Sequence, residues 1–197
     1  MKIGILGGTF DPPHFAHLKI AQLALRKFGL NRVIFMLSAK QPIKIGKRKM
    51  APVNHRLEML KLLIQGYPQF EIFDLELKRA KRGQKSYTID TIYALKKLYP
   101  GDKIYWILGA DSFQELIEGK WKDGGKVLKL VDLIVASRPG YLVKIPKNIK
   151  IKRLKINCNI SSTEIRERFK RGKNAAVLLP QKVLNYIKKN KLYIKIK

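Results

Sequence analysis

The sequence predicts an α/β fold in which helices cover both faces of a mostly parallel sheet. Short apolar runs, beginning with KIGIL at residues 2–6, alternate along the chain with stretches of helical periodicity. Of the 197 residues, 46% are apolar, and a chain of this length buries roughly 70% of its extended surface on folding. Such a core needs no disulfide or metal, and a single domain over residues 1–197 is expected.

Each element is expected from its own pattern. Strands are expected at 2–6, 32–37, 70–75, 103–108, 132–136 and 149–156, the last of which alternates Ile or Leu with Lys and suits a sheet edge. Helices are expected at 15–28 (ended by Gly29), 54–65, 88–98, from about 111, 162–171 and 181–189, with irregular chain at 38–52 and a basic loop at 78–85. Ligands of such sheets bind beyond the carboxyl ends of the strands. The loops after residues 6, 37, 108 and 159 are therefore the candidates for a site.

The chain is strongly basic, with 42 Lys+Arg against 14 Asp+Glu and a net charge of +28. Residues 133–197 alone hold 18 basic residues against two acidic ones. This charge attracts nucleic acid, anionic lipid or polyphosphate alike, and a general Lys bias of the proteome explains it equally well. The chain has no zinc spacing and no aromatic RNA-binding stripe, so no nucleic-acid partner is expected. A single cysteine, Cys158, and no apolar run near 18–20 residues indicate a cytoplasmic protein without a membrane partner.

The loop after the first strand reads GGTFDPPHFAH, residues 7–17. Its two glycines allow a ligand to approach the backbone closely, and backbone N–H groups at the next helix start can hold phosphate. His14 and His17 are three residues apart and project to one side of a helix. Surface or capping roles remain open for both, and a zinc site would lack a nearby third ligand. The loop is neither a Walker motif nor a dinucleotide fingerprint.

Residues 160–166, ISSTEIR, admit two interpretations. Ser161 and Glu164 have the spacing of a helix capping box. The same helix start would present backbone N–H groups, two spare hydroxyls and Arg166 to a phosphate. The sequence leaves these two roles open.

Three further places carry candidate residues. Gly109 and Asp111 follow the fourth strand, where the carboxylate would either accept from ribose hydroxyls or cap the next helix. The segment SYTIDT, residues 86–91, opens a helix behind the basic loop. Trp121 and Arg138 are also candidates, against the simpler interpretations of a core aromatic and a polar loop residue.

Together these pieces resemble the bacterial nicotinate-nucleotide adenylyltransferase family of the nucleotidyltransferase superfamily. The resemblance runs nearly end to end, with motifs in order at 7–17, 42–44 (PIK), 86–91, 108–112 (LGADS), 138–140 (RPG), 160–166 and 179–193. It implies a Rossmann-like, doubly wound sheet within one nucleotidyltransferase domain, 1–197, and a C-terminal helical elaboration from about residue 160. The partners it implies are ATP and nicotinate mononucleotide, and a homo-oligomer is left open.

The resemblance also implies a reaction. The 5′-phosphate of nicotinate mononucleotide attacks the α-phosphorus of ATP, and pyrophosphate leaves, with Mg²⁺ carried by ATP and no metal held by protein side chains. The implied catalytic residues are His14, His17, Lys44, Thr163 and Arg166. The implied ATP-binding residues are Gly7, Gly8, Thr9, Phe10, His14, His17, Gly109, Asp111, Ile160, Ser161, Ser162, Thr163 and Arg166, and those for the mononucleotide are Lys44, Thr88, Trp121 and Arg138.

Two departures from the family pattern and two alternatives accompany this resemblance. Ala16 stands where the family has Gly and could crowd ATP, and Ile43 stands where it has His, which removes a possible phosphate contact. One alternative is a sister adenylyltransferase acting on nicotinamide mononucleotide or phosphopantetheine, although SYTIDT, Trp121 and RPG favour the nicotinate branch. The other is a basic nucleic-acid-binding module on an inactive nucleotidyltransferase fold.

Overall fold

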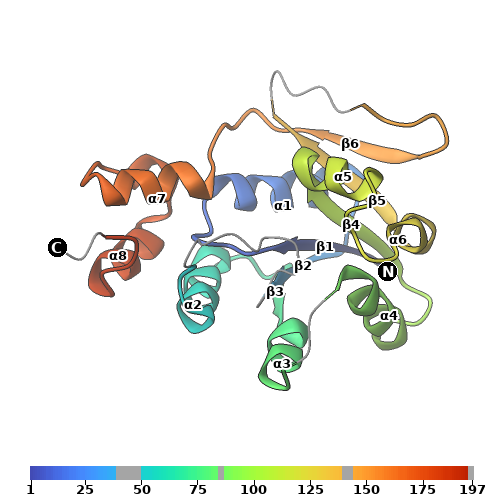
Figure 1. The fold of residues 1–197 in the computed structure, drawn as a ribbon, viewed down its shortest axis with the longest axis horizontal. Coiled ribbons are helices and arrows are strands. Elements are labelled where there is room, and N and C mark those ends of the chain that lie inside the picture. The colour runs from blue at the N-terminus through green and yellow to red at the C-terminus, as the bar shows by residue number, and fades with distance from the viewer. Residues whose placement is uncertain (39–49, 84–86, 139–143, 195–197) are drawn as a thin grey trace.

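The computed structural model describes residues 1–38, 50–83, 87–138 and 144–194. In these residues six strands form one sheet (Figure 1). They are β1 (Lys2–Gly8), β2 (Arg32–Leu37), β3 (Phe70–Phe73), β4 (Lys103–Gly109), β5 (Asp132–Ser137) and β6 (Ile151–Lys155). Within the described ranges, no helix combines the length and apolarity that a membrane crossing needs.

Every neighbouring pair in the sheet is parallel, and the strand order is β3-β2-β1-β4-β5-β6. From β1 the chain forms β2 and then β3 on one side of β1. It then crosses to the other side of β1, where it forms β4. The order therefore reverses between β1 and β4. The carboxyl ends of two such strands diverge into loops on opposite sides, which opens a crevice for a ligand. The predicted doubly wound sheet is confirmed, and it is parallel throughout the described residues.

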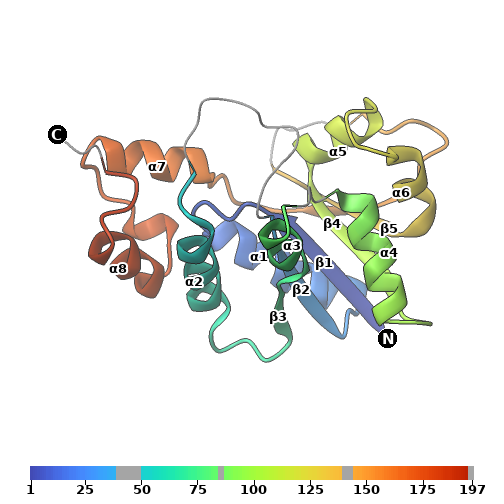
Figure 2. The ribbon, with the colours of Figure 1, turned by 60° about the horizontal axis from the view of Figure 1, so that its bottom comes forward.

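The helices lie on both faces of the sheet (Figures 1 and 2). They are α1 (Phe15–Phe28), α2 (Val53–Ile64), α3 (Leu75–Lys81), α4 (Thr88–Leu98), α5 (Ala110–Ile117), α6 (Gly124–Leu130), α7 (Ser162–Lys170) and α8 (Gln181–Lys189), with a short 3₁₀ turn at Ala176–Leu178. One apolar cluster joins one sheet face to α1, α2, α7 and α8, and a second joins the other face to α4, α5 and α6. In both views α7 and α8 lie at one end of the molecule, with α4, α5 and α6 at the other.

The strand sequences account for this layering. Successive residues of a strand point to opposite faces, so Ile5 belongs to one cluster and Leu6 to the other. A strand covered on both faces has to be apolar nearly throughout, as β2 is. The first helix ends as predicted, because Gly29 adopts the left-handed conformation (φ 59°) that side chains disfavour.

Two helices differ from the sequence predictions. The predicted basic loop at 78–85 is wrong for residues 78–81, which belong to α3, and this helix also shortens the strand predicted at 70–75 to β3. Leu75 and Leu77 pack against the two core clusters, and this packing outweighs the concentration of charge. Helix α6 was not predicted, because Gly124 and Gly125 disfavour a helix. Its Val127 is fully buried, so tertiary packing decides its conformation.

Candidate active site

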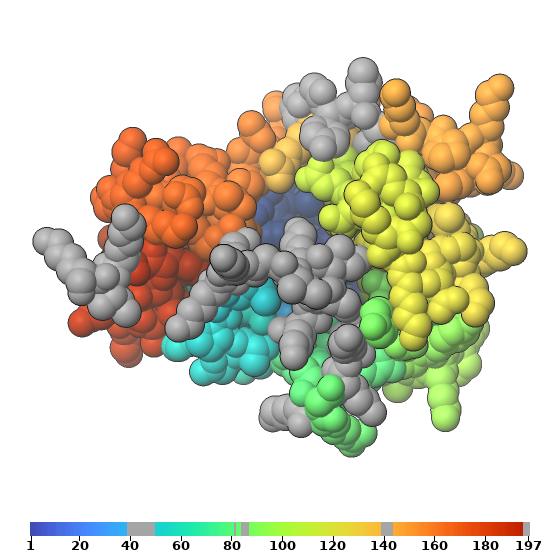
Figure 3. Space-filling view, viewed as in Figure 1, coloured from blue at the N-terminus to red at the C-terminus, as the bar shows by residue number. Residues whose placement is uncertain are grey.

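A cavity of about 580 Å³ opens at the crevice between β1 and β4. In the space-filling view it is the hollow between α7 and α5, with N-terminal residues at its floor (Figure 3). Ten of its lining residues were predicted from the sequence: Gly7, Gly8, Thr9, His14, His17, Gly109, Asp111, Arg138, Ser161 and Ser162. The motifs at 7–17 and 160–166 therefore meet in one cavity.

The loop between β1 and α1 is held in shape by an internal contact. Phe10 has a left-handed backbone (φ 47°) and a ring that is 1% exposed. The ring packs beneath Gly8 and meets the imidazole of His17 edge-on, with 5.0 Å between ring centroids. Phe10 was expected to contact ATP, but its ring does not line the cavity. Its observed contacts support Gly8 and His17 from behind.

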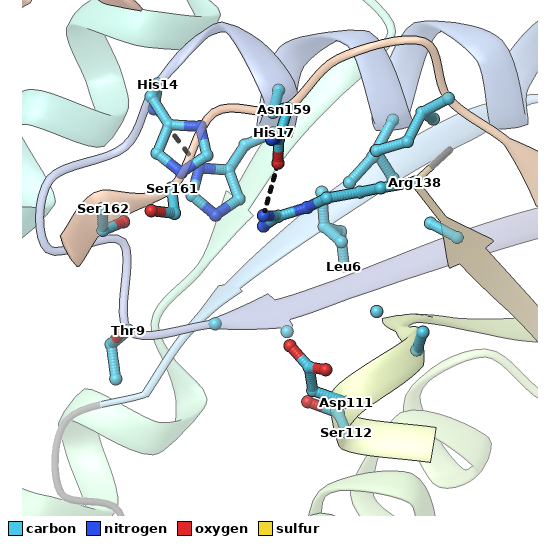
Figure 4. A pocket seen from close by; sticks show the side chains of 18 residues that line it. Leu6, Thr9, His14, His17, Asp111, Ser112, Arg138, Asn159, Ser161 and Ser162 are labelled. Carbon is cyan, nitrogen blue, oxygen red and sulfur yellow. Dashed lines mark hydrogen bonds between the residues drawn. The ribbon is translucent and has the colours of Figure 1, made fainter. Parts of the chain in front are cut away.

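His14 and His17 form a stacked pair at the start of α1. Their ring centroids are 3.8 Å apart with 29° between the planes. The backbone N–H of His14 donates to Nδ1 of His17 over 3.2 Å. Since Nδ1 accepts this bond, the neutral ring of His17 carries its proton on Nε2. The two histidines thus project together, as their spacing predicted (Figure 4).

Both imidazoles are neutral at pH 7. Burial lowers the pKa of His17 to about 3, and the positive charge of Arg138 adds to this effect. Burial, followed by the charges of His17 and Arg138, also lowers the pKa of His14 well below its usual value. Nδ1 of His14 is buried and has no hydrogen-bond partner among the described residues. An unsatisfied polar atom of this kind costs about 1–3 kcal/mol and is a group that a bound ligand can satisfy.

Arg138 supplies a positive charge to the cavity from the end of β5. Its Nη1 donates to Oδ1 of Asn159 over 3.3 Å. Figure 4 shows this pair beside the two histidines, with Asp111 and Ser112 facing them across the cavity. Asp111 is exposed and lies one residue inside α5, whose N-cap position is taken by Gly109. Its carboxylate is therefore not the helix cap that the sequence had left open.

Three helices begin at this cavity. The N-cap residues of α1, α5 and α7 are His14, Gly109 and Ser161, and all three line it. The first N–H groups of a helix have no partners within the helix, and the helix dipole places partial positive charge there. Three such ends together with Arg138 favour a ligand that carries several negative charges. The cavity is thus suited to a polyphosphate.

The ISSTEIR segment serves as cap and cavity wall together. The Ser161 hydroxyl accepts from the N–H of Glu164 over 3.1 Å, which is the capping interaction. The Glu164 carboxylate, however, accepts from Arg168, so only the serine half of the capping box is seen. Ser161 and Ser162 both line the cavity. Of the two hydroxyls expected to be spare, that of Ser162 donates to the carbonyl of Pro12 over 2.9 Å, whereas that of Thr163 accepts from Arg166 and keeps its own proton to donate.

Arg166 is buried behind this helix start, at 7% exposure. Its Nη1 donates to the carbonyl of Asp11 over 2.6 Å, and its Nη2 donates to Oγ1 of Thr163 over 2.9 Å. Thr163, Arg166 and Ile160 are not among the lining residues. Arg166 thus ties α7 to the loop that carries the histidines.

Of the residues expected on the mononucleotide side, Thr88 and Trp121 lie outside the cavity that Arg138 lines. Thr88 is the first residue of α4, and Trp121 is partly buried against the core cluster of that face. Neither lines the cavity. Their segments lie close together, because Nζ of Lys122 is 4.5 Å from the ring centroid of Tyr87. Lys44 and Ile43 lie outside the described residues.

Several residues of this region were not predicted. Asn159 and Ser112 line the cavity, and their place beside the ISSTEIR and LGADS motifs was the available signal. Ala16, whose methyl group was expected near ATP, also lines the cavity and is 3% exposed. Arg56 is buried and donates to the carbonyls of Thr9 and Ser38 over 2.9 and 2.7 Å. No local pattern marks such a residue, because its partners are distant in sequence.

Metal-binding side chains do not gather anywhere in the ranges that the structure covers. In those ranges no group of three or more His, Cys, Asp or Glu could hold a metal ion. Among the described residues that line the cavity, Asp111 is the one with a carboxylate side chain.

Comparison with known proteins agrees with this geometry. A family model described as cytidylyltransferase-like matches residues 5–168. The nicotinate-nucleotide adenylyltransferase of Bacillus subtilis is 42% identical over 98% of both chains. A probable enzyme of the same name from Desulfitobacterium hafniense is 41% identical over 98% of this chain and 95% of its own. Fold and cavity define a nucleotidyltransferase.

The particular branch follows from these relatives, and the chain belongs to the nicotinate-nucleotide adenylyltransferase family. A solved structure supports the fold. Plasmodium falciparum nicotinic acid mononucleotide adenylyltransferase complexed with NaAD matches with a TM-score of 0.79 at 21% identity, over 98% of this chain and 97% of that one.

Proposed function

We propose that this chain transfers the adenylyl group of ATP to nicotinate mononucleotide, giving nicotinate adenine dinucleotide and pyrophosphate in NAD biosynthesis. The observation that carries the proposal is the meeting of the histidine pair with the start of α7 in one cavity ringed by three helix N-termini. The names of the relatives supply the acceptor.

In the proposed reaction a 5′-phosphate oxygen of the mononucleotide forms a bond to the α-phosphorus of ATP. The bond from that phosphorus to the oxygen bridging to the β-phosphorus breaks, and pyrophosphate carries away the electron pair. Such a transfer depends on positioning and charge neutralisation more than on covalent catalysis. The cavity is suited to both, so the proposed transfer uses no covalent intermediate on the protein.

The proposed roles follow the positions of the side chains. His14 and His17 donate from their ring N–H groups to phosphate oxygens, and the charge of the phosphate favours their protonation. The helix N-termini receive the triphosphate. Asp111 accepts from the ribose of ATP beside Gly109, and Arg138 lies near the mononucleotide phosphate. Lys44, Thr88 and Trp121 are assigned to the mononucleotide on the resemblance alone. Thr163 and Arg166 serve the triphosphate by holding the start of α7 against the histidine loop.

Mg²⁺ is proposed to enter with ATP. Phosphate oxygens and water are the ligands that this ion prefers, and when bound it neutralises phosphate charge in the transition state. The proposal also places the protein in the cytoplasm. It further treats residues 1–197 as one domain, in which the helices after residue 160 complete the site.

A pyrophosphate-release assay with ATP and three acceptors tests the proposal. Release should be faster with nicotinate mononucleotide than with nicotinamide mononucleotide, and absent with phosphopantetheine. A clear preference for either of the other acceptors would assign the chain to a sister activity. No release with any of them, together with a salt-dependent gel shift on nucleic acid, would support the binding-module alternative.

A further inference from the structure

A hydrogen bond joins the two ends of the chain behind the cavity. The hydroxyl of Tyr193, beyond α8, donates to Oδ1 of Asp11 over 2.7 Å, across 182 positions of sequence. Asp11 is fully buried and Tyr193 is partly buried. Neither residue lines the cavity. A charge-assisted hydrogen bond at a buried carboxylate is stronger than one between neutral groups.

Asp11 lies in the middle of the loop that carries His14. Its Oδ1 also accepts from the N–H of Ala51 over 3.2 Å, and its carbonyl accepts from Arg166. Three segments distant in sequence therefore fix this one residue: the chain before α2, helix α7 and the C-terminal tail. Two residues, Pro12 and Pro13, separate Asp11 from His14. Proline restricts the backbone, so displacement of Asp11 passes along the loop to the imidazoles.

The tail is shaped to reach this loop. Lys191 and Tyr193 both have left-handed backbones, with φ of 50° and 63°. Side chains disfavour this conformation, and it persists only where surrounding contacts maintain it. The ring of Tyr193 lies 6.3 Å from that of Phe169 in α7. Burial and the Asp11 carboxylate raise the pKa of the Tyr193 hydroxyl, so it remains a donor throughout the neutral range.

We propose that Tyr193 is a positioning residue for adenylyl transfer, which holds the histidine loop in place through its hydrogen bond to Asp11. Only the expected change in kcat rests on the proposed function. The C-terminal tail thereby belongs to the working site, although no atom of Tyr193 touches the cavity.

The test compares two substitutions that each remove one hydroxyl. Tyr193→Phe removes the bond to Asp11. The matched control, Tyr186→Phe, removes a bond of 2.9 Å to Nδ1 of His55, between α8 and α2. Both variants should fold, and Tyr193→Phe should lose more thermal stability than the control because its bond is made to a buried carboxylate. We expect Tyr193→Phe to lower kcat for pyrophosphate release between about ten- and a hundred-fold, since misplacement by about 1 Å costs that much. The KM for the acceptor should stay within about two-fold, and the control should keep kcat within about two-fold of the wild type.

A second measurement does not depend on the acceptor. The chain has three histidines, so their imidazoles can be followed by NMR through a pH titration. Loosening the loop admits water, and the pKa of His17 should then rise in Tyr193→Phe and stay unchanged in Tyr186→Phe. Equal kcat in the two variants, with the titrations of His14 and His17 unchanged in both, would overturn the inference. If the wild type released no pyrophosphate with any acceptor, the proposed function would fail, and the titration would still decide the positioning role.

Discussion

Replacing Gly8 with alanine tests how closely the first loop is packed. A Cβ built at Gly8 lies 3.2, 3.3 and 3.4 Å from three carbons of the Phe10 ring. Ordinary contacts begin at about 3.4 Å, so the ring would have to move. It has little freedom to do so, because it is 1% exposed and packs against Phe35 and His17 with centroids 5.8 and 5.0 Å away.

The neighbouring residue gives the matched control. Among the residues that the structure describes, a Cβ at Gly7 meets only Trp106, at 3.5 Å, which is ordinary contact. Both substitutions restrict the unfolded chain equally, so that contribution of about 0.4–1 kcal/mol cancels between them. What remains is the crowding in the core, which costs about 1–3 kcal/mol. Gly8→Ala should therefore be less stable than Gly7→Ala by about that amount.

Urea unfolding of both variants gives the free energies by linear extrapolation. The extra cost at Gly8 should disappear when Phe10 is replaced by leucine, because a smaller side chain leaves room for the methyl group. Equal stability of Gly8→Ala and Gly7→Ala, or a cost that persists in the Phe10→Leu background, would refute the reasoning.

Three further predictions concern His17, Glu76 and Arg166. The pKa of His17 is lowered to about 3, so the wild type has its full stability above about pH 6.5 and loses it as the pH falls towards 3. Between pH 7 and 5, the free energy of unfolding in urea should fall less for His17→Gln than for the wild type. Equal decreases would contradict the lowered pKa of the buried His17 ring. Burial raises the pKa of Glu76 above 4.5. Ionisation of this carboxyl therefore lowers the free energy of unfolding as the pH rises above 4.5. The melting temperature of Glu76→Gln relative to the wild type should rise between pH 4.5 and 7.5. A relative decrease over this range would contradict the raised pKa. Arg166→Ala should remove a donor from the Asp11 carbonyl, cost about 1–3 kcal/mol in urea unfolding and lower pyrophosphate release about a hundred-fold, because the histidine loop loses its tie to α7. Near-wild-type turnover would contradict this role.

Much of the fold could be predicted because the signals are local. The bounds of α1, β2, α4 and α8 agree with the predicted ranges, since each pattern of apolar residues reflects a single period. Gly29 marks a helix end through its own backbone. Helices α3 and α6 could not be predicted in the same way, because their stability comes from contacts with distant residues.

In the candidate site too, local features could be predicted and long-range contacts could not. The sequence by itself determined which side chains are candidates for the chemistry, since the motifs at 7–17, 108–112 and 160–166 place residues next to strand ends and helix starts. Only the tertiary structure decided that these ends share one cavity and that Phe10 and Arg166 support it from behind. It also joined Tyr193 to Asp11. The physical reason is that residue type and spacing encode local geometry, whereas burial and hydrogen-bond partners depend on segments that meet only when the sheet has formed.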